Sequence, residues 1–248
     1  MSNVAAGAAD ALTFDPNMEV AMRPMVDPVQ PRRGFLARLT GAIAAVAAGS
    51  ATTPRSAFAE SPVVADDRWL QAIHGDHRQY FDAVSVAGGF PLVYALSWAN
   101  TMKATYNLTN DQLCAVIGLR HMGIAPAFND AIWEKYKLGQ FFKVDDPKTK
   151  QPSTRNIFNS TAPGDLRFPG SDVGSQMKNG AVVVACNLAT TVLSGIAANA
   201  AGLSMAPEAA YKEWAAGLVP GVMLVPSGVL AVHRAQAVGK CTYCAAVE

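Results

Sequence analysis

Apolar residues along the chain follow two different spacings from residue 77 onward. Short continuous apolar runs are typical of strands buried on both faces of a parallel sheet, and apolar residues three or four positions apart are typical of helices. The runs predict strands within 77–86, 112–119, 181–186, 221–226 and the terminal CTYCAAV. The spaced segments predict helices at 90–107, 128–142, 188–202, 206–219 and 227–239.

Strands therefore alternate with helices, which predicts an α/β fold with a mainly parallel sheet and helices on both faces. Ligands of such sheets bind beyond the carboxyl ends of the strands. The residues that directly follow the predicted strands are therefore the first candidates for a site: Arg120, His121, Cys186, Asn187 and Ser227.

One long segment, 143–174, has no periodicity and is rich in Pro, Gly, Asp and Ser. Loops of this length are uncommon unless they are functional or mobile. We interpret this segment as an insertion near the face of the protein that carries the functional site. Asn129 and Ser227 precede predicted helices and are expected to be their N-caps.

The N-terminal part of the chain has the features of an export signal. Arg32 and Arg33 precede a weakly apolar run that ends at residue 48, and Ala57-Phe58-Ala59 provides a small-residue cleavage site. This order predicts a twin-arginine signal over 1–59, the export machinery as a partner, and a periplasmic protein with one domain over 60–248. A retained signal would tether the protein to the membrane, and the alternative interpretation is a chance arginine pair in a tail.

Composition narrows the classes of function. The chain has 248 residues, of which 50% are apolar and 16% charged, with a formal net charge of +1. That balance suits a globular protein with a substantial core and argues against nucleic-acid binding, which needs a strongly basic face. The sequence has no glycine-rich phosphate loop and no G-x-S-x-G nucleophile elbow.

Cys186 is placed where a buried strand ends and a helix begins. The first turn of a helix has unpaired N–H groups and a positive dipole end, which stabilise a thiolate. Arg120 could attract an anionic ligand, and His121 could act as a base or orient the thiol. The alternatives are that Cys186 is a small buried apolar residue and that Arg120 and His121 belong to an ordinary surface loop.

Cys241 and Cys244 form a C-x-x-C pair, which suits a redox site or half of a zinc site. His74 and His77 would share one face if they lay on a helix, and could complete a metal site if the two segments met. The alternatives are solvated histidines and either a terminal disulfide, which requires a turn within CTYC, or free thiols. No cofactor is predicted.

The segment GAVVVACNLA…LSGIAANAAGL resembles the cysteine element of the DsrE/DsrF-like family. HRQYFDAVSVAGGFPLVYALSWANTM, AVIGLRHMGIAPAFNDAIWEKYKLG and LVPSGVLAVHRAQAVGKCTYC resemble an exported branch of that family. The resemblance implies a flavodoxin-like three-layer sandwich, a homo-oligomer, and a persulfide on Cys186 exchanged with a sulfur donor or acceptor protein. The export signal, the 143–174 segment and the C-terminal cysteine pair depart from the family pattern.

Three functions follow from these observations. The first is an exported protein that handles thiols or sulfur through Cys186. The second is a metal- or redox-binding module built on Cys241 and Cys244. The third is a non-catalytic oligomeric binding subunit, which an inert Cys186 and a large exposed apolar patch would favour.

Overall fold

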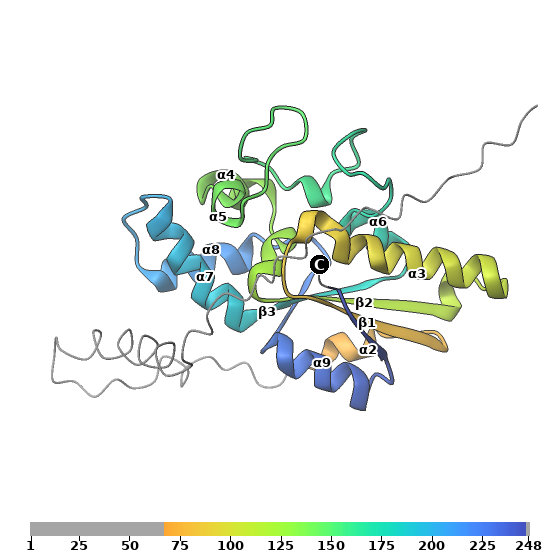
Figure 1. The fold of residues 1–248 in the computed structure, drawn as a ribbon. Coiled ribbons are helices and arrows are strands. Elements are labelled where there is room, and N and C mark those ends of the chain that lie inside the picture. The colour runs from red at the N-terminus through yellow and green to blue at the C-terminus, as the bar shows by residue number, and fades with distance from the viewer. Residues whose placement is uncertain (1–66, 247–248) are drawn as a thin grey trace, which may run out of the picture. The chain divides into compact units, whose positions relative to one another are not determined.

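The computed structural model describes residues 67–246, so the predicted signal with Arg32 and Arg33 and the boundary at residue 59 lie outside the described residues. Residues 67–246 contain a five-stranded sheet, all parallel, in the order β4-β3-β2-β1-β5 (Figure 1). The strands are β1 (His77–Ala83), β2 (Leu113–Leu119), β3 (Val182–Cys186), β4 (Met223–Val225) and β5 (Thr242–Ala245). The predicted α/β class and all five strands are confirmed.

Helices cover both faces of this sheet. They are α2 (Arg68–Gln71), α3 (Phe90–Tyr106), α4 (Asp130–Lys135), α5 (Leu138–Phe142), α6 (Val173–Lys178), α7 (Asn187–Ala200), α8 (Pro207–Ala216) and α9 (Gly228–Ala237). Four short 3₁₀ helices are added: η1 (Ala87–Gly89), η2 (Asn110–Gln112), η3 (His121–Ala127) and η4 (Ile157–Asn159). No helix within 67–246 combines the length and apolar character that a membrane crossing requires.

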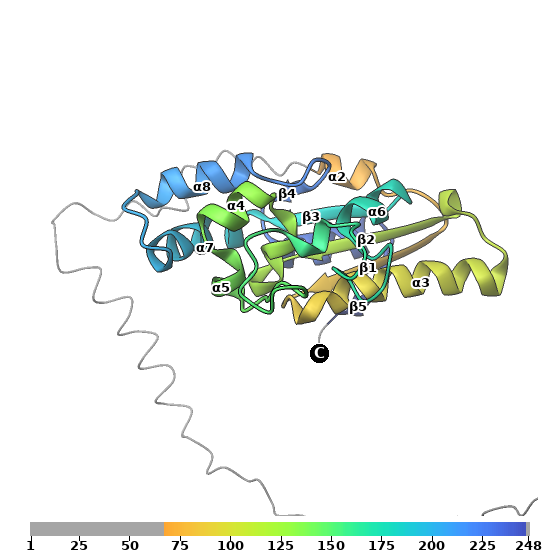
Figure 2. The same cartoon turned by 90° about the horizontal axis from the view of Figure 1, so that it is seen from above.

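The alternation of side chains along the strands divides the core into two layers. Tyr80, Val116 and Val184 belong to the cluster beneath α9, while Phe81 and Ile117 belong to the cluster on the opposite face. α3 lies over that opposite face, and α9 and α2 lie together on the other side of the sheet (Figures 1 and 2). The arrangement is consistent with a flavodoxin-like three-layer sandwich.

The single helix predicted over 128–142 is wrong, because the chain forms α4 and α5 with a break between them. Asn129 caps α4 as predicted, since its side chain accepts a hydrogen bond from Ile132 N. Lys137 then adopts a left-handed φ of 49°, which ends the first helix. A Cβ at Gly139 would lie 2.2 Å from the Ser153 carbonyl oxygen. Because glycine has no side chain, α5 can approach the 143–174 segment closely at this position.

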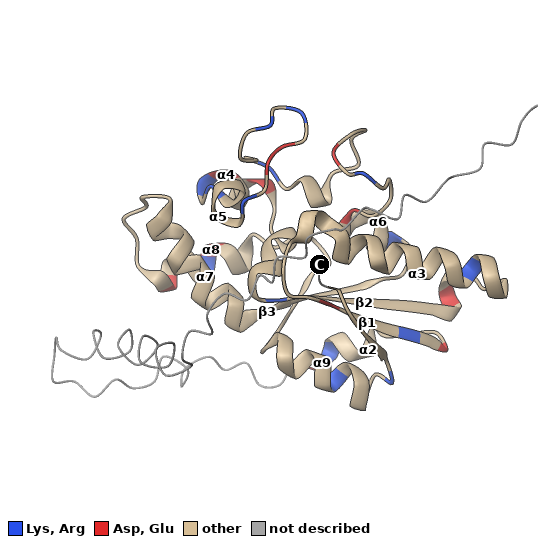
Figure 3. Ribbon diagram, in the orientation of Figure 1, with Lys and Arg blue, Asp and Glu red and all other residues tan. Residues whose placement is uncertain are grey.

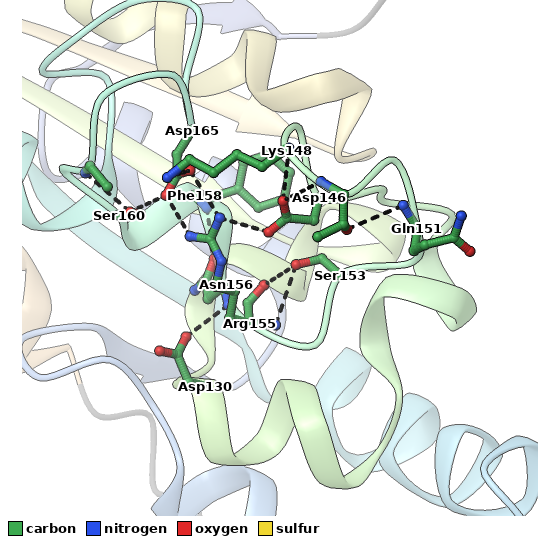
Figure 4. A network of polar contacts seen from close by, with 12 residues as sticks. Asp130, Asp146, Lys148, Gln151, Ser153, Arg155, Asn156, Phe158, Ser160 and Asp165 are labelled. Atoms are coloured by element: carbon green, nitrogen blue, oxygen red, sulfur yellow. Dashed lines mark hydrogen bonds and ion pairs between the residues drawn. The ribbon is translucent and has the colours of Figure 1, made fainter.

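The 143–174 segment is held by an ionic network centred on Arg155 (Figure 4). Its guanidinium binds both oxygens of Asp165, and its Nη2 lies 2.6 Å from Asp146 Oδ2. Lys148 Nζ lies 3.3 Å from Asp165 Oδ1. Asn156 fastens the segment to the core, because its amide donates to the carbonyls of Pro126 and Phe128. Polar side chains thus hold the segment together with its buried apolar residues, among them Ile157 and Phe158.

Candidate functional site

A cavity of about 280 Å³ opens beyond the carboxyl ends of β2, β3 and β4. Its lining residues come from the three strand ends, the first two turns of α7 and the first turn of α9: Arg120, His121, Cys186, Leu188, Ala189, Val192, Leu193, Ser227, Gly228 and Val229. The expectation that the residues following separate strands share one edge is confirmed for Arg120, His121, Cys186 and Ser227. No residue of 143–174 is among the residues that line this cavity.

Cys186 occupies the N-cap position of α7, as the sequence predicts. It ends β3 with extended backbone angles, and its Sγ accepts a hydrogen bond from Ala189 N at 3.3 Å. The residue is only 6% exposed, yet it lines the cavity. An acceptor at this position receives one of the unpaired N–H groups of the helix, and the dipole favours a negative charge there. Cys186 is therefore enclosed by protein on most sides and borders a cavity of a size that a small molecule can occupy.

Arg120 is held in the cavity wall by a buried carboxylate. Its Nε and Nη2 donate to the two oxygens of Asp82 at 2.6 and 2.8 Å. The Asp82 side chain is 3% exposed and also accepts a hydrogen bond of 2.9 Å from the Tyr243 hydroxyl. Hydrogen bonding to Asp82 raises the pKa of Arg120, and burial together with the bond to Asp82 raises the pKa of Tyr243.

α9 fixes the other side of the Arg120 side chain. A Cβ at Gly228 would lie 2.5 Å from Arg120 Cβ and 2.6 Å from its Cδ. The aliphatic stem of Arg120 therefore packs directly on the first residue of α9, where no larger residue fits without a shift. Ser227 caps this helix as predicted, accepting a hydrogen bond from Leu230 N at 3.4 Å.

His121 and Asn187 occupy less central positions. His121 is exposed and has a left-handed φ of 51°, so it stands at the rim of the cavity. Asn187 is buried, and its side-chain oxygen accepts a hydrogen bond of 2.9 Å from the Tyr211 hydroxyl of α8. It is the one strand-following candidate that does not line the cavity.

Exposed aliphatic side chains lie on and beside this cavity. Leu188, Val192 and Ile196 follow one another at helical spacing on α7 and are 42%, 48% and 51% exposed. Val229 and Leu230 on α9 are 68% and 40% exposed. We call these five residues the apolar rim. α7 has no charged residue along its length (Figure 3).

The second candidate site does not assemble. Cys241 is buried in the cluster beneath α9, whereas Cys244 packs against the cluster on the opposite face of the sheet. The pair lies along an extended strand with no turn, and both thiols are free, so the disulfide alternative is wrong. Three residues apart on a strand, two side chains point to opposite faces.

The two histidines do not lie on one helix. His77 is the first residue of β1, and His74 precedes the strand, with its Nδ1 3.1 Å from the Ala72 carbonyl oxygen. Within residues 67–246, no three His, Cys, Asp or Glu side chains are grouped closely enough to hold a metal ion.

Sequence reasoning missed Asp82, Tyr243 and Gly228. Asp82 stands in a strand whose neighbours are buried, and a buried carboxylate requires a partner. That requirement is the signal that could have identified Asp82, but only the parallel pairing of β1 with β2 and β5 identifies Arg120 and Tyr243 as its partners.

Comparison of the chain with protein-family models, with curated proteins and with solved structures gives no match.

Proposed function

We propose that this protein handles sulfur or thiols through Cys186, which carries a sulfane sulfur atom as a persulfide. The observation that supports this most strongly is the position of Cys186: its sulfur accepts the Ala189 N–H at the start of α7, and the residue lines the cavity. The resemblance of the surrounding segment to the cysteine element of the DsrE/DsrF-like family points to the same chemistry. Arg32 and Arg33 support a periplasmic location for it.

The step needs one co-reactant, an organic persulfide R–S–SH. The Cys186 thiolate attacks the outer sulfur of the donor, a new S–S bond forms on Cys186, and the S–S bond of the donor breaks. The departing group R–S⁻ keeps the electron pair of the broken bond and takes a proton from solvent. No external oxidant is consumed, because the sulfane sulfur moves between two thiols without a net change of redox state.

The surroundings of Cys186 suit this exchange. The Ala189 N–H and the helix dipole stabilise negative charge on the attacking sulfur and on the persulfide that replaces it. The aliphatic walls of the cavity provide a surface against which an apolar R group of the donor can pack. His121 lines the cavity and is exposed, so its imidazole can pass a proton from solvent to the departing thiolate.

The test is to incubate the protein with a low-molecular-weight organic persulfide and to locate the added sulfur by peptide mass spectrometry. We expect the sulfur on Cys186, no retention in Cys186→Ser, and unchanged loading in the control Cys244→Ser. Equal loading of Cys186→Ser and the unsubstituted protein would contradict the proposal.

The apolar rim supports a second candidate function, that of an oligomeric binding subunit. Five aliphatic side chains are exposed on adjoining parts of α7 and α9, and contiguous exposed apolar surface is typical of association sites. We propose a second copy of this chain as the occupant, because the uncharged α7 allows two copies to approach without repulsion between like charges.

A further inference from the structure

We infer that the Cys186 cavity selects small thiol-reactive molecules that have an apolar body and one anionic end group, and that Asp82 and Tyr243 position Arg120 to recognise the anion. This inference rests on the proposed function and names the substrate class of the same site.

The guanidinium of Arg120 is fixed in both position and orientation. Asp82 takes the Nε and Nη2 donors of Arg120 in a two-point contact. Such a contact fixes the plane of the guanidinium as well as its position. Nη1 has no hydrogen-bond partner among residues 67–246, the side chain is 26% exposed, and Arg120 lines the cavity. Arg120 therefore keeps one unused donor and lines the same cavity as Cys186.

The carboxylate is itself restrained from two further elements. The Tyr243 hydroxyl of β5 donates to Asp82 Oδ2, the same oxygen that accepts from Arg120 Nη2. Gly228, the first residue of α9, packs against the aliphatic stem of Arg120. Contacts from β1, β5 and α9 thus converge on a residue that follows β2, which is more restraint than an exposed surface arginine ordinarily receives.

The other residues that line the cavity indicate the chemical character of the rest of the ligand. Leu188, Val192, Leu193 and Val229 provide aliphatic walls, and no acidic residue lines the cavity. A neutral apolar molecule would leave the Nη1 donor of Arg120 without an acceptor, and a highly charged one would leave its other charges against aliphatic carbon. A single anionic group on an apolar body satisfies both parts of the cavity.

The experiment compares two alkylating reagents of nearly equal size, iodoacetate and iodoacetamide, which differ in charge. The rate constant at Cys186 is measured for each by peptide mass spectrometry, and their ratio cancels differences in thiol reactivity. We expect Arg120→Gln to lower the iodoacetate-to-iodoacetamide ratio about fivefold, as for a partly exposed charge. Arg120→Lys should retain part of the preference, and the control Arg167→Gln, in the 143–174 segment, should leave the ratio unchanged.

Tyr243→Phe tests the positioning role with little risk to folding, because it removes one hydroxyl from a half-exposed side chain. It should lower the same ratio by a smaller factor of about two, while the iodoacetamide rate alone stays constant. An unchanged ratio in Arg120→Gln overturns the inference and leaves the proposed function intact. Failure of both reagents to modify Cys186 in the folded protein overturns the proposed function and the inference with it.

Discussion

At the scale of single residues, two tyrosines lie near Asp82 on the face of the sheet that α9 covers, one with a paired hydroxyl and one with an unpaired hydroxyl. Tyr243 donates its hydroxyl to Asp82, while the Tyr80 hydroxyl is buried and has no partner among residues 67–246. Burial, followed by the negative charge of Asp82, raises the pKa of Tyr80 strongly. The ring fits because residue 118 is glycine: a Cβ there would lie 1.8 Å from the Tyr80 oxygen.

These two tyrosines give a matched pair of substitutions. We expect Tyr80→Phe to leave the free energy of unfolding unchanged or to raise it by up to about 1 kcal/mol, because an unpaired buried hydroxyl is removed. Tyr243→Phe should lower the free energy by about 1 kcal/mol, because a hydrogen bond to a carboxylate is lost. Urea unfolding at neutral pH measures both. A loss of more than about 1 kcal/mol in Tyr80→Phe would show that its hydroxyl has a partner.

At the scale of elements, the 143–174 segment adds ionic contacts to the apolar packing of Val144, Ile157, Phe158 and Val173 in the core. Arg155 joins Asp146 to Asp165, and hydrogen bonds from Arg155 are the main cause that holds the pKa of Asp165 well below its usual range. Because the folded state favours the charged carboxylate, this contribution to stability is present at neutral pH. It decreases as the pH falls below about 4, the ordinary pKa of an aspartate.

Arg155→Met should therefore destabilise this segment selectively. We expect faster amide hydrogen exchange across 143–174 and little change in β1–β3, since the buried Asp165 keeps only the contacts of exposed Lys148 and of the Ser160 hydroxyl. The difference from the unsubstituted protein should diminish below pH 4. Lys148→Met is the control, because Lys148 is 56% exposed and a surface ion pair contributes little. Equal effects of the two substitutions would contradict the prediction that Arg155 contributes more than Lys148 to the stability of the segment.

At the scale of the whole molecule, the sequence predicts the five strands and the strand ends that meet at the cavity, because buried parallel strands form unbroken apolar runs. It does not predict the break between α4 and α5, since Lys137 carries no signal for a left-handed turn. Nor does it predict the contacts of Asp82, which join residues 38 and 161 positions apart along the chain. Strand order, which no local pattern encodes, brings them together.

The apolar rim gives a prediction about association. If a second copy occupies the rim, Val192→Asp should shift the protein toward monomer in size-exclusion chromatography with light scattering, because a charge would be buried in the interface. Val238→Asp is a matched control: Val238 is 47% exposed, against 48% for Val192, and follows the far end of α9. A monomer at all concentrations, or an equal shift in both variants, would contradict a dimer at the rim.

The central claim is that the Cys186 sulfur is reachable and is activated by its place at the start of α7. A brief pulse of iodoacetamide at neutral pH, followed by peptide mass spectrometry, compares Cys186 with Cys244 in the same folded molecule. Cys244 is partly exposed and lacks the helix N-terminus, whereas Cys186 is 6% exposed and has it. The account predicts that Cys186 is modified first. Modification of Cys244 ahead of Cys186 would contradict it.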